Sequence, residues 1–220
     1  MKKIIKNISI FISYFIYEYI FIFILYGLNI NYYDLDIKNK VLFLSGMNFI
    51  YIVFLFFVYK GEIKKDLEDF KEKHNSYLSK YLSYYLIGIL LMGLSNIILQ
   101  YFTKLDMSGN EKEVRELIKI LPTYMIFSSV IYAPFVEEII FRKSIKNVIK
   151  NPYIFIIISG FLFGILHIND YKNFSEILMG IPYIIMGLDF AYIYHKTNNI
   201  FTTMTFHFCH NLILLLIQLI

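Results

Sequence analysis

Tryptophan is absent from this chain, cysteine occurs only once, as Cys209, and the 17% of charged residues is low. A single cysteine excludes a disulfide within the chain and any cysteine-rich metal site. Without tryptophan, the 20 tyrosines are left to form the aromatic belt at a membrane surface. The net charge of +4 does not indicate nucleic-acid binding, because the lysines fall in short segments between apolar runs. We therefore expect no nucleic-acid partner.

Apolar residues make up 58% of the 220 positions, against about 45–50% in a typical soluble domain. Apolar runs of bilayer-spanning length recur along the chain. They predict an all-α fold, a polytopic membrane helix bundle of about seven transmembrane helices. The expected spans are 8–28, 41–59, 81–102, a long stretch from 117 to 150, and then 152–168, 177–194 and 200–220. The stretch 117–150 is too long for one ordinary span, and Pro134 is its expected kink or break.

The chain reads as one integral membrane domain with two parts. Residues 1–120 hold the first spans, and residues 121–220 form the expected catalytic core. The first span lacks a small-x-small cleavage site and is too long for a signal peptide, so it is expected to be retained. Residues 60–80 are rich in lysine and form either an amphipathic helix on the membrane surface or a solvated connector. Residues 103–116 are expected to be a polar loop.

The distribution of lysine and arginine predicts the orientation of the chain. Most of these residues lie at the start of the chain and in the segments 60–80 and 142–150. The positive-inside rule then places the N-terminus in the cytoplasm. The composition, rich in Ile, Lys, Asn and Tyr, suggests a bacterial genome rich in A and T, and hence a bacterial plasma membrane.

The most informative stretch is 133–142, in which two adjacent carboxylates and an arginine interrupt an apolar run. Glu138 and Arg142 are four residues apart, so on a helix they can pair. Glu137 points about 100° away and has no local partner. A buried charge is expensive unless it is paired or used in chemistry. The pattern therefore favours a functional site over a purely structural ion network.

Three polar residues in later spans are candidate partners for Glu137. His167 ends a glycine-containing apolar run, and His207 and Asn211 are four residues apart and share a helix face. Glu137 and His167 lie at similar distances from the turn at 151–152, so they are expected at similar depth. His210 points elsewhere and is expected to be a bystander or a supporting residue.

These groups suit activation of water. Glu137 would act as general base on a water that attacks an amide carbonyl, and His167 would orient that water. His207 and Asn211 would donate hydrogen bonds to the oxyanion. The alternative is a zinc site made from Glu137, His167 and His207. The chain has neither a His-Glu-x-x-His helix nor a Gly-x-Ser-x-Gly turn, so the commonest metalloprotease and serine hydrolase templates are excluded.

The three motifs Glu137-Glu138-x-x-x-Arg142, Phe163-x-x-x-His167 and His207-x-x-x-Asn211 resemble the signature of the CAAX-protease and bacteriocin-processing (CPBP, or Abi) family of intramembrane endopeptidases. The resemblance covers residues 124–220. It implies an α-helical fold with a catalytic cavity inside the membrane, a catalytic glutamate at Glu137, and functional residues at His167, His207 and Asn211. Members are named metalloproteases, although their better-studied eukaryotic relatives resemble glutamate-dependent enzymes. Lys143 replaces a glycine that many relatives have after the arginine and is expected to affect helix packing.

The leading hypothesis is an intramembrane endopeptidase that hydrolyses peptide bonds of membrane-associated peptides or membrane-anchored proteins. The family resemblance points to peptide maturation, export or self-immunity to bacteriocins. One alternative is a non-catalytic membrane protein that confers immunity or acts as a scaffold, for which Glu137 is not required. Another is a small proton-coupled transporter that uses Glu18, Glu137 and Asp189. Gly160-x-x-x-Gly164 hints at close helix packing within or between chains.

Overall fold

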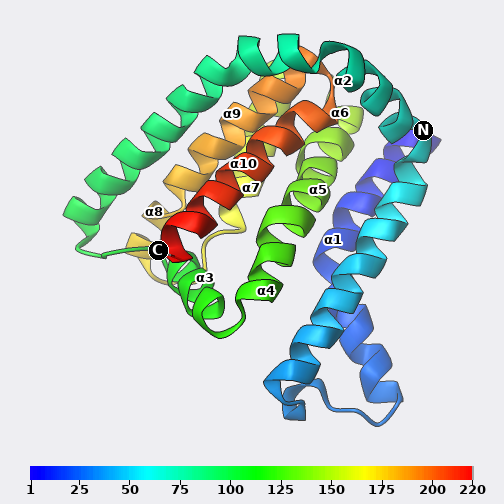
Figure 1. Ribbon diagram of the computed structural model, residues 1–220, viewed down its shortest axis with the longest axis vertical. Helices are drawn as coiled ribbons and strands as arrows, with labels where there is room; N and C mark the ends of the chain where they lie inside the picture. Colours follow the sequence, from blue (N-terminus) through cyan, green and yellow to red (C-terminus); the bar gives the residue numbers. More distant parts are fainter. Residues whose placement is uncertain (220) are drawn as a thin grey trace.

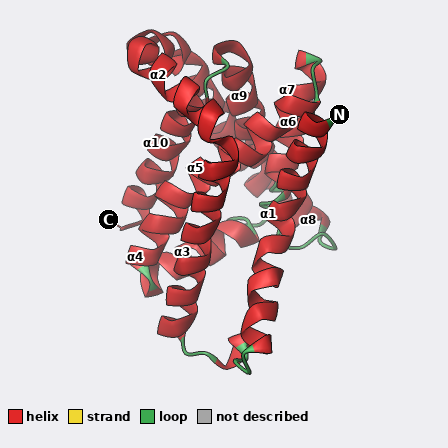
Figure 2. Ribbon diagram, turned by 90° about the vertical axis from the view of Figure 1, so that its right-hand side faces the viewer, coloured by secondary structure: helices red, strands yellow, loops and turns green. Residues whose placement is uncertain are grey.

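The computed structural model describes residues 1–219, and this part of the chain is built from helices joined by short loops (Figures 1 and 2). The α-helices are α1 Lys2–Gly27, α2 Ile37–Thr103, α3 Gly109–Ile120, α4 Pro122–Met125, α5 Ala133–Glu137, α6 Ile145–Val148, α7 Pro152–Ile165, α8 Phe174–Leu178, α9 Ile181–Thr197 and α10 Ile200–Leu219. A 3₁₀ turn, η1, covers Tyr32–Asp34, and two π-helical segments, η2 and η3, cover Ile126–Tyr132 and Glu138–Ser144. The described residues include no strand, so the all-α prediction is confirmed.

Five helical stretches among the described residues are long and apolar enough to cross a membrane. They are Lys2–Gly27, Ile37–Thr103, Pro122–Val148, Phe174–Thr197 and Ile200–Gln218. The apolar helix α7 has 14 residues and is shorter than these. The expected count of seven spans is not confirmed, mainly because the second and third expected spans belong to one helix.

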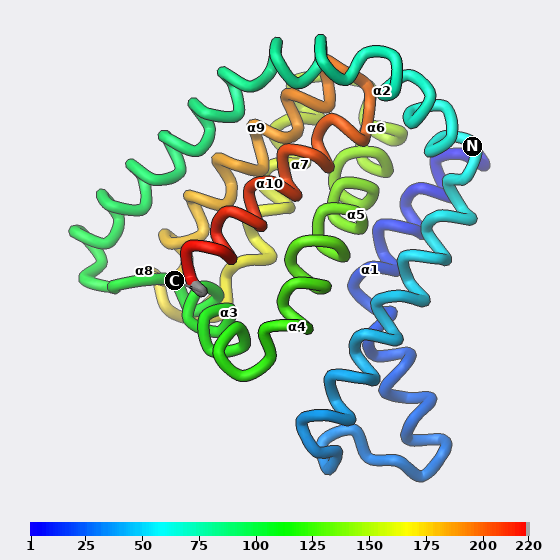
Figure 3. Tube along the Cα trace, viewed as in Figure 1, coloured from blue at the N-terminus to red at the C-terminus, as the bar shows by residue number. Residues whose placement is uncertain are grey.

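That helix, α2, has 67 residues and would be about 100 Å long if it were straight. Instead it arches: it rises near α1, crosses one end of the bundle and descends beside α9 (Figure 3). The lysine-rich segment 60–80 is helical and forms the crossing part of α2, with lysines such as Lys64 and Lys65 exposed on its outer side. Its residue Ile63 is buried in the same apolar cluster as Val136 and Ile139.

Polar contacts fix the crossing part of α2 to the core. Lys143 Nζ lies 2.5 Å from Asp66 Oδ2, and both side chains are almost fully buried. Asn199, at the turn between α9 and α10, donates from Nδ2 to the backbone carbonyl of Asp66 over 2.7 Å. The unusual lysine after Arg142 thus does affect helix packing, because it pairs α2 with η3.

Residues 103–150 differ from the sequence prediction. The expected polar loop contains α3, whose first turn is capped by Ser108: its Oγ accepts from the amide of Glu111 at 3.2 Å. The helical stretch that contains Glu137 begins at Pro122, after a break at Leu121, rather than at Leu117. Pro134 does not break it, because the helix continues through the π-helical segments on both sides.

The helices α7 and α9 pack closely because three glycines lie between them. A β-carbon on Gly160 would lie 2.7 Å from the backbone nitrogen of Leu188, and one on Gly164 would lie 2.6 Å from that of Ile184. Gly187 meets the backbone of Gly160 from the other side. The Gly-x-x-x-Gly pattern therefore serves packing within the chain. It holds the end of α7 in place, and the next turn contains His167.

We predict that Gly160→Ala destabilises the protein, because the added methyl group overpacks this contact at a cost of about 1–3 kcal/mol. The matched control is Gly93→Ala on α2, where nothing lies within 4 Å of the new β-carbon. That control should be neutral or stabilising by up to about 1 kcal/mol, since alanine favours helix. Thermal unfolding of both variants in detergent tests this. Equal unfolding temperatures for the two variants would contradict the close packing.

Candidate active site

The cavity that contains the predicted site residues has a volume of about 620 Å³. Glu137 reaches it from the end of α5, and His207 and Asn211 from α10. His167 reaches it from the turn that follows α7, and Phe163 from the last turns of α7. The structure therefore brings Glu137, His167, His207 and Asn211 together on one cavity.

The two adjacent glutamates have different surroundings. The side chain of Glu138 is fully buried, and its Oε2 lies 3.2 Å from Nε of Arg142, as the spacing of four residues predicts. Arg142 also donates from Nη1 to Ser159 Oγ on α7 over 2.9 Å. The side chain of Glu137 keeps 14% of its surface exposed and lines the cavity. Of the two glutamates, only Glu137 thus faces the cavity.

His207 connects the two glutamates. Its Nδ1 lies 3.0 Å from Glu138 Oε1, and because a carboxylate only accepts, Nδ1 must carry the proton. Its Nε2 is turned toward Glu137, 3.9 Å from Oε2, which is longer than a direct hydrogen bond. Glu138 therefore fixes both the orientation of the ring and the position of its proton, as a second residue does for many catalytic histidines.

His167 is also held by a backbone group. The sequence places it inside a span ending at 168, but α7 ends at Ile165 and His167 lies in the following turn. Its Nδ1 donates to the carbonyl of Phe163 over 3.1 Å, which leaves the Nε2 lone pair of the neutral ring as an acceptor. Its ring stacks on Tyr183 of α9 with a centroid distance of 4.4 Å.

Asn211 is anchored through a carbonyl that Pro134 leaves free. In η2 the amide of Ala133 bonds to the carbonyl of Ser128. The next residue, Pro134, has no N–H to give to Ser129. The free Ser129 carbonyl accepts from Asn211 Nδ2 over 2.8 Å. The proline thus creates the contact that positions Asn211, and one amide hydrogen of Asn211 remains for another acceptor.

Phe163 packs against both histidines and Arg142. Its ring centroid lies 5.0 Å from that of His167 and 5.8 Å from that of His207. The guanidinium carbon of Arg142 lies 4.8 Å from the same centroid, in a cation–π geometry. One apolar side chain therefore separates the two histidines and covers the arginine.

The sequence analysis missed the residues that hold these groups: Ser129, Ser159 and Tyr183. Ser159 could have been suspected as a lone hydroxyl beside Gly160 in an apolar helix, whereas Ser129 and Tyr183 had no local signal. Glu18 lines the same cavity, where Tyr17 donates to its Oε1 over 3.1 Å.

Two further candidates lie at the margin of the site. His210 lines the cavity, and its ring contacts Tyr85 and Phe190 edge-on. Asp189 packs against Gly88, where α9 meets α2. Neither residue forms a hydrogen bond with the four predicted site residues.

The zinc alternative can be tested against the donor positions. Within residues 1–219, no three His, Cys, Asp or Glu side chains lie close enough together to hold a metal ion. Both histidines donate from Nδ1 and keep Nε2 free, which is also how many metal-ligating histidines are held, so only the separation of the donors counts against a metal. Glu137, His167 and His207 therefore do not fit a three-ligand metal site, and no step of the chemistry is assigned to a metal.

Residues 119–213, which contain all three motifs, match the family described as "Type II CAAX prenyl endopeptidase Rce1-like". This segment, which is less than half of the chain, is similar to that family. The resemblance inferred from the motifs is thus confirmed. With its long apolar helices, the chain is an integral membrane protein.

Two curated relatives are similar to this chain. One is the "Putative membrane peptidase YdiL" of Bacillus subtilis (strain 168), 32% identical over 115 residues, or 51% of this chain and 44% of the relative. The other is the "UPF0177 protein YvdC" of Lactococcus lactis subsp. lactis (strain IL1403), 27% identical over 141 residues, 61% of this chain and 52% of the relative. The chain thus spans about half the length of each relative. No solved structure matches it significantly.

We predict that Arg142→Met destabilises the protein by about 3–5 kcal/mol, because it leaves the buried charge of Glu138 without its cation. The control is Arg115→Met, which breaks an exposed Arg–Glu pair of the same spacing, with Glu111 Oε1 at 2.6 Å. That loss should be below about 1 kcal/mol. Chemical denaturation of both variants in detergent measures the difference, and similar losses would show that the buried pair does not stabilise the fold.

Proposed function

We propose that this protein is an intramembrane endopeptidase that hydrolyses peptide bonds of membrane-associated peptides or membrane-anchored proteins. The observation that carries the proposal is that the two adjacent glutamates have different surroundings. Glu138 neutralises Arg142 and orients His207, while Glu137 faces a cavity shared with two histidines and an asparagine. A purely structural ion network would need Glu138 but not Glu137.

In the proposed reaction, Glu137 takes a proton from a water molecule as the water oxygen bonds to the carbonyl carbon of the substrate. Nε2 of neutral His167 accepts a hydrogen bond from the same water and orients it. When the tetrahedral intermediate collapses, the C–N bond breaks, and the proton held by Glu137 passes to the leaving amine. Glu137 is then regenerated as a carboxylate.

The oxyanion of the intermediate needs hydrogen-bond donors. In its doubly protonated form, His207 keeps one proton toward Glu138 and can donate the other from Nε2. Glu138 stabilises that imidazolium as a buried counter-ion. The second amide hydrogen of Asn211 is the other donor. Both groups are held by the protein before substrate binds, through Glu138 and through the Ser129 carbonyl.

The substrate class follows from where the cavity lies. The helices that line it include several apolar enough to cross a membrane, which supports a substrate that reaches the cavity from the membrane. The family description names prenyl endopeptidases, and one relative is named as a membrane peptidase. We propose a bacterial plasma membrane with the N-terminus in the cytoplasm, and peptide maturation or self-immunity as the cellular role. None of the contacts at the site requires a lipidated substrate.

Glu137→Gln should lower the turnover of cleaved peptides by about 10²–10⁴-fold, the usual contribution of a general base. Glutamine keeps the size of the side chain and removes its basicity. The assay uses purified protein in detergent with a library of membrane-anchored peptides and mass spectrometry of the products. The control is Glu18→Gln, which changes a carboxylate on another wall of the same cavity and should retain most activity.

The outcomes of this assay separate the proposal from its alternatives. Cleavage by wild type that Glu137→Gln abolishes supports the endopeptidase. Unchanged cleavage by Glu137→Gln contradicts the role of Glu137. If wild type cleaves no peptide and Glu137→Gln still confers immunity in cells, the protein acts as a scaffold.

Metal removal provides a separate prediction. Because Glu137, His167 and His207 do not gather as metal ligands, cleavage should survive incubation with a strong zinc chelator. The control is a known zinc peptidase treated in the same detergent, which must lose its activity. Loss of cleavage by the chelator, with recovery on adding zinc, would replace the glutamate mechanism with a metal mechanism.

A further inference from the structure

A second cavity, of about 700 Å³, lies apart from the candidate active site. Its wall combines the first turns of α1, the crossing part of α2, the end of the η3–α6 helix and the turn between α9 and α10. It shares no lining residue with the cavity of Glu137. The proposed peptidase chemistry does not use it.

Charge distinguishes this cavity, which we call the lysine pocket. Lys2, Lys3, Lys6, Lys65 and Lys143 line it, together with the acidic residues Glu62 and Asp66. Each carboxylate is matched by one lysine: Lys6 lies 3.6 Å from Glu62, and Lys143 lies 2.5 Å from Asp66. Lys2, Lys3 and Lys65 have no ion pair with any residue in 1–219 and remain exposed at the pocket. The pocket thus has a surplus of three cations.

The deeper part of the pocket is held rigidly. Asn147, which lines it, donates from Nδ2 to Asn7 Oδ1 over 3.1 Å, and the same oxygen accepts from Tyr59 over 2.7 Å. Lys143 keeps only 5% of its side chain exposed. The bottom of the pocket is therefore a fixed polar surface, and the three unpaired lysines lie around it.

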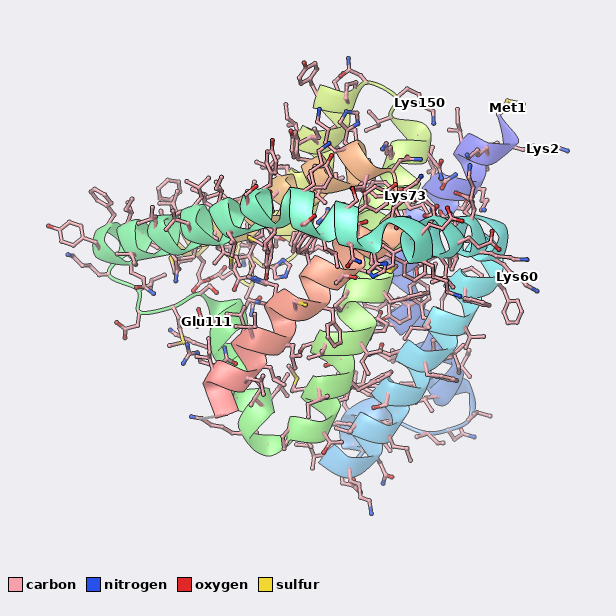
Figure 4. The ribbon with its side chains drawn as sticks, turned by 45° about the horizontal axis from the view of Figure 1, so that its top comes forward. Met1, Lys2, Lys60, Lys73, Glu111 and Lys150 are labelled. Carbon is pink, nitrogen blue, oxygen red and sulfur yellow. The ribbon has the colours of Figure 1, made fainter. Side chains whose placement is uncertain are left out.

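The position of the pocket suggests what covers it. Figure 4 shows Met1, Lys2, Lys60, Lys73 and Lys150 around one end of the bundle, with Glu111 away from them. Directly below this end, α1 and the first arm of α2 expose apolar residues such as Ile12 and Phe57. A membrane protein with apolar walls below a lysine-rich rim places that rim at the level of the lipid headgroups.

We propose that the lysine pocket binds a phosphate-bearing anion. Three ammonium groups without carboxylate partners match the charge and the several acceptor oxygens of a phosphate. The headgroup of an anionic phospholipid is the source that the location favours, and a soluble phosphate ester shares the same chemistry. The proposal goes beyond the endopeptidase and does not depend on it.

The test is binding of phosphatidylglycerol with eight-carbon chains to the purified full chain in a neutral detergent, measured by native mass spectrometry. Phosphatidylcholine of the same chain length is the uncharged comparison, and glycerol 3-phosphate is the soluble comparison. We expect tighter binding of phosphatidylglycerol than of phosphatidylcholine. The triple variant Lys2→Gln, Lys3→Gln, Lys65→Gln should weaken it by roughly fivefold for each lysine.

The matched control is Lys60→Gln, Lys71→Gln, Lys80→Gln, which removes the same charge from exposed positions of α2 outside the pocket. It should bind phosphatidylglycerol as wild type does, and both triple variants should unfold at the wild-type temperature because all six lysines are exposed. Equal weakening by the two triple variants, or no preference for phosphatidylglycerol, would overturn the proposal. Binding of glycerol 3-phosphate as tight as that of the lipid supports the phosphate site and identifies a soluble ester as its ligand.

Discussion

The buried ion pair between Glu138 and Arg142 is the interaction on which the rest of the structure depends. Two charges with no exposed surface are strongly unfavourable unless other groups compensate them. The compensating groups come from other helices: His207 of α10 bonds to Glu138, and Ser159 of α7 accepts from Arg142. Satisfying one local pair therefore forces α7 and α10 into fixed positions, and with them His207 and the end of α7. The same interaction leaves Glu137, the neighbouring residue, free to face the cavity.

Irregular helix geometry supplies the remaining constraints. Two π-helical segments flank Pro134, and π-helical turns often occur at functional sites because they shift side chains and free backbone groups. The Ser129 carbonyl, left without an N–H by Pro134, becomes the acceptor for Asn211. The hydrogen bond that the Ser129 carbonyl lacks within its own helix is thus supplied by Asn211 of α10. The irregular helix geometry therefore helps to determine how α10 packs.

The segment η3 also connects the two polar regions of the molecule. Its residue Arg142 belongs to the buried network of the candidate site, and the next residue, Lys143, pairs with Asp66 beside the lysine pocket. Figure 1 shows α2 crossing the bundle at this end, while α5 and α10, which carry candidate site residues, descend from it. Two consecutive residues therefore have separate roles: Arg142 stabilises the candidate site, and Lys143 binds the crossing part of α2.

The sequence by itself determined the fold class, the helical character of the chain and the residues that gather at the candidate site. Apolar content and charge in apolar surroundings are local properties, so the Glu138–Arg142 pair and the gathering of Glu137, His167, His207 and Asn211 could be predicted from spacing. Only the tertiary structure decided which glutamate faces the cavity, that α2 is one arched helix, and that Pro134 positions Asn211. These features depend on contacts between residues far apart in the chain, such as Ser159 with Arg142 and Asp66 with Lys143. The local sequence pattern does not show which distant residues will pair.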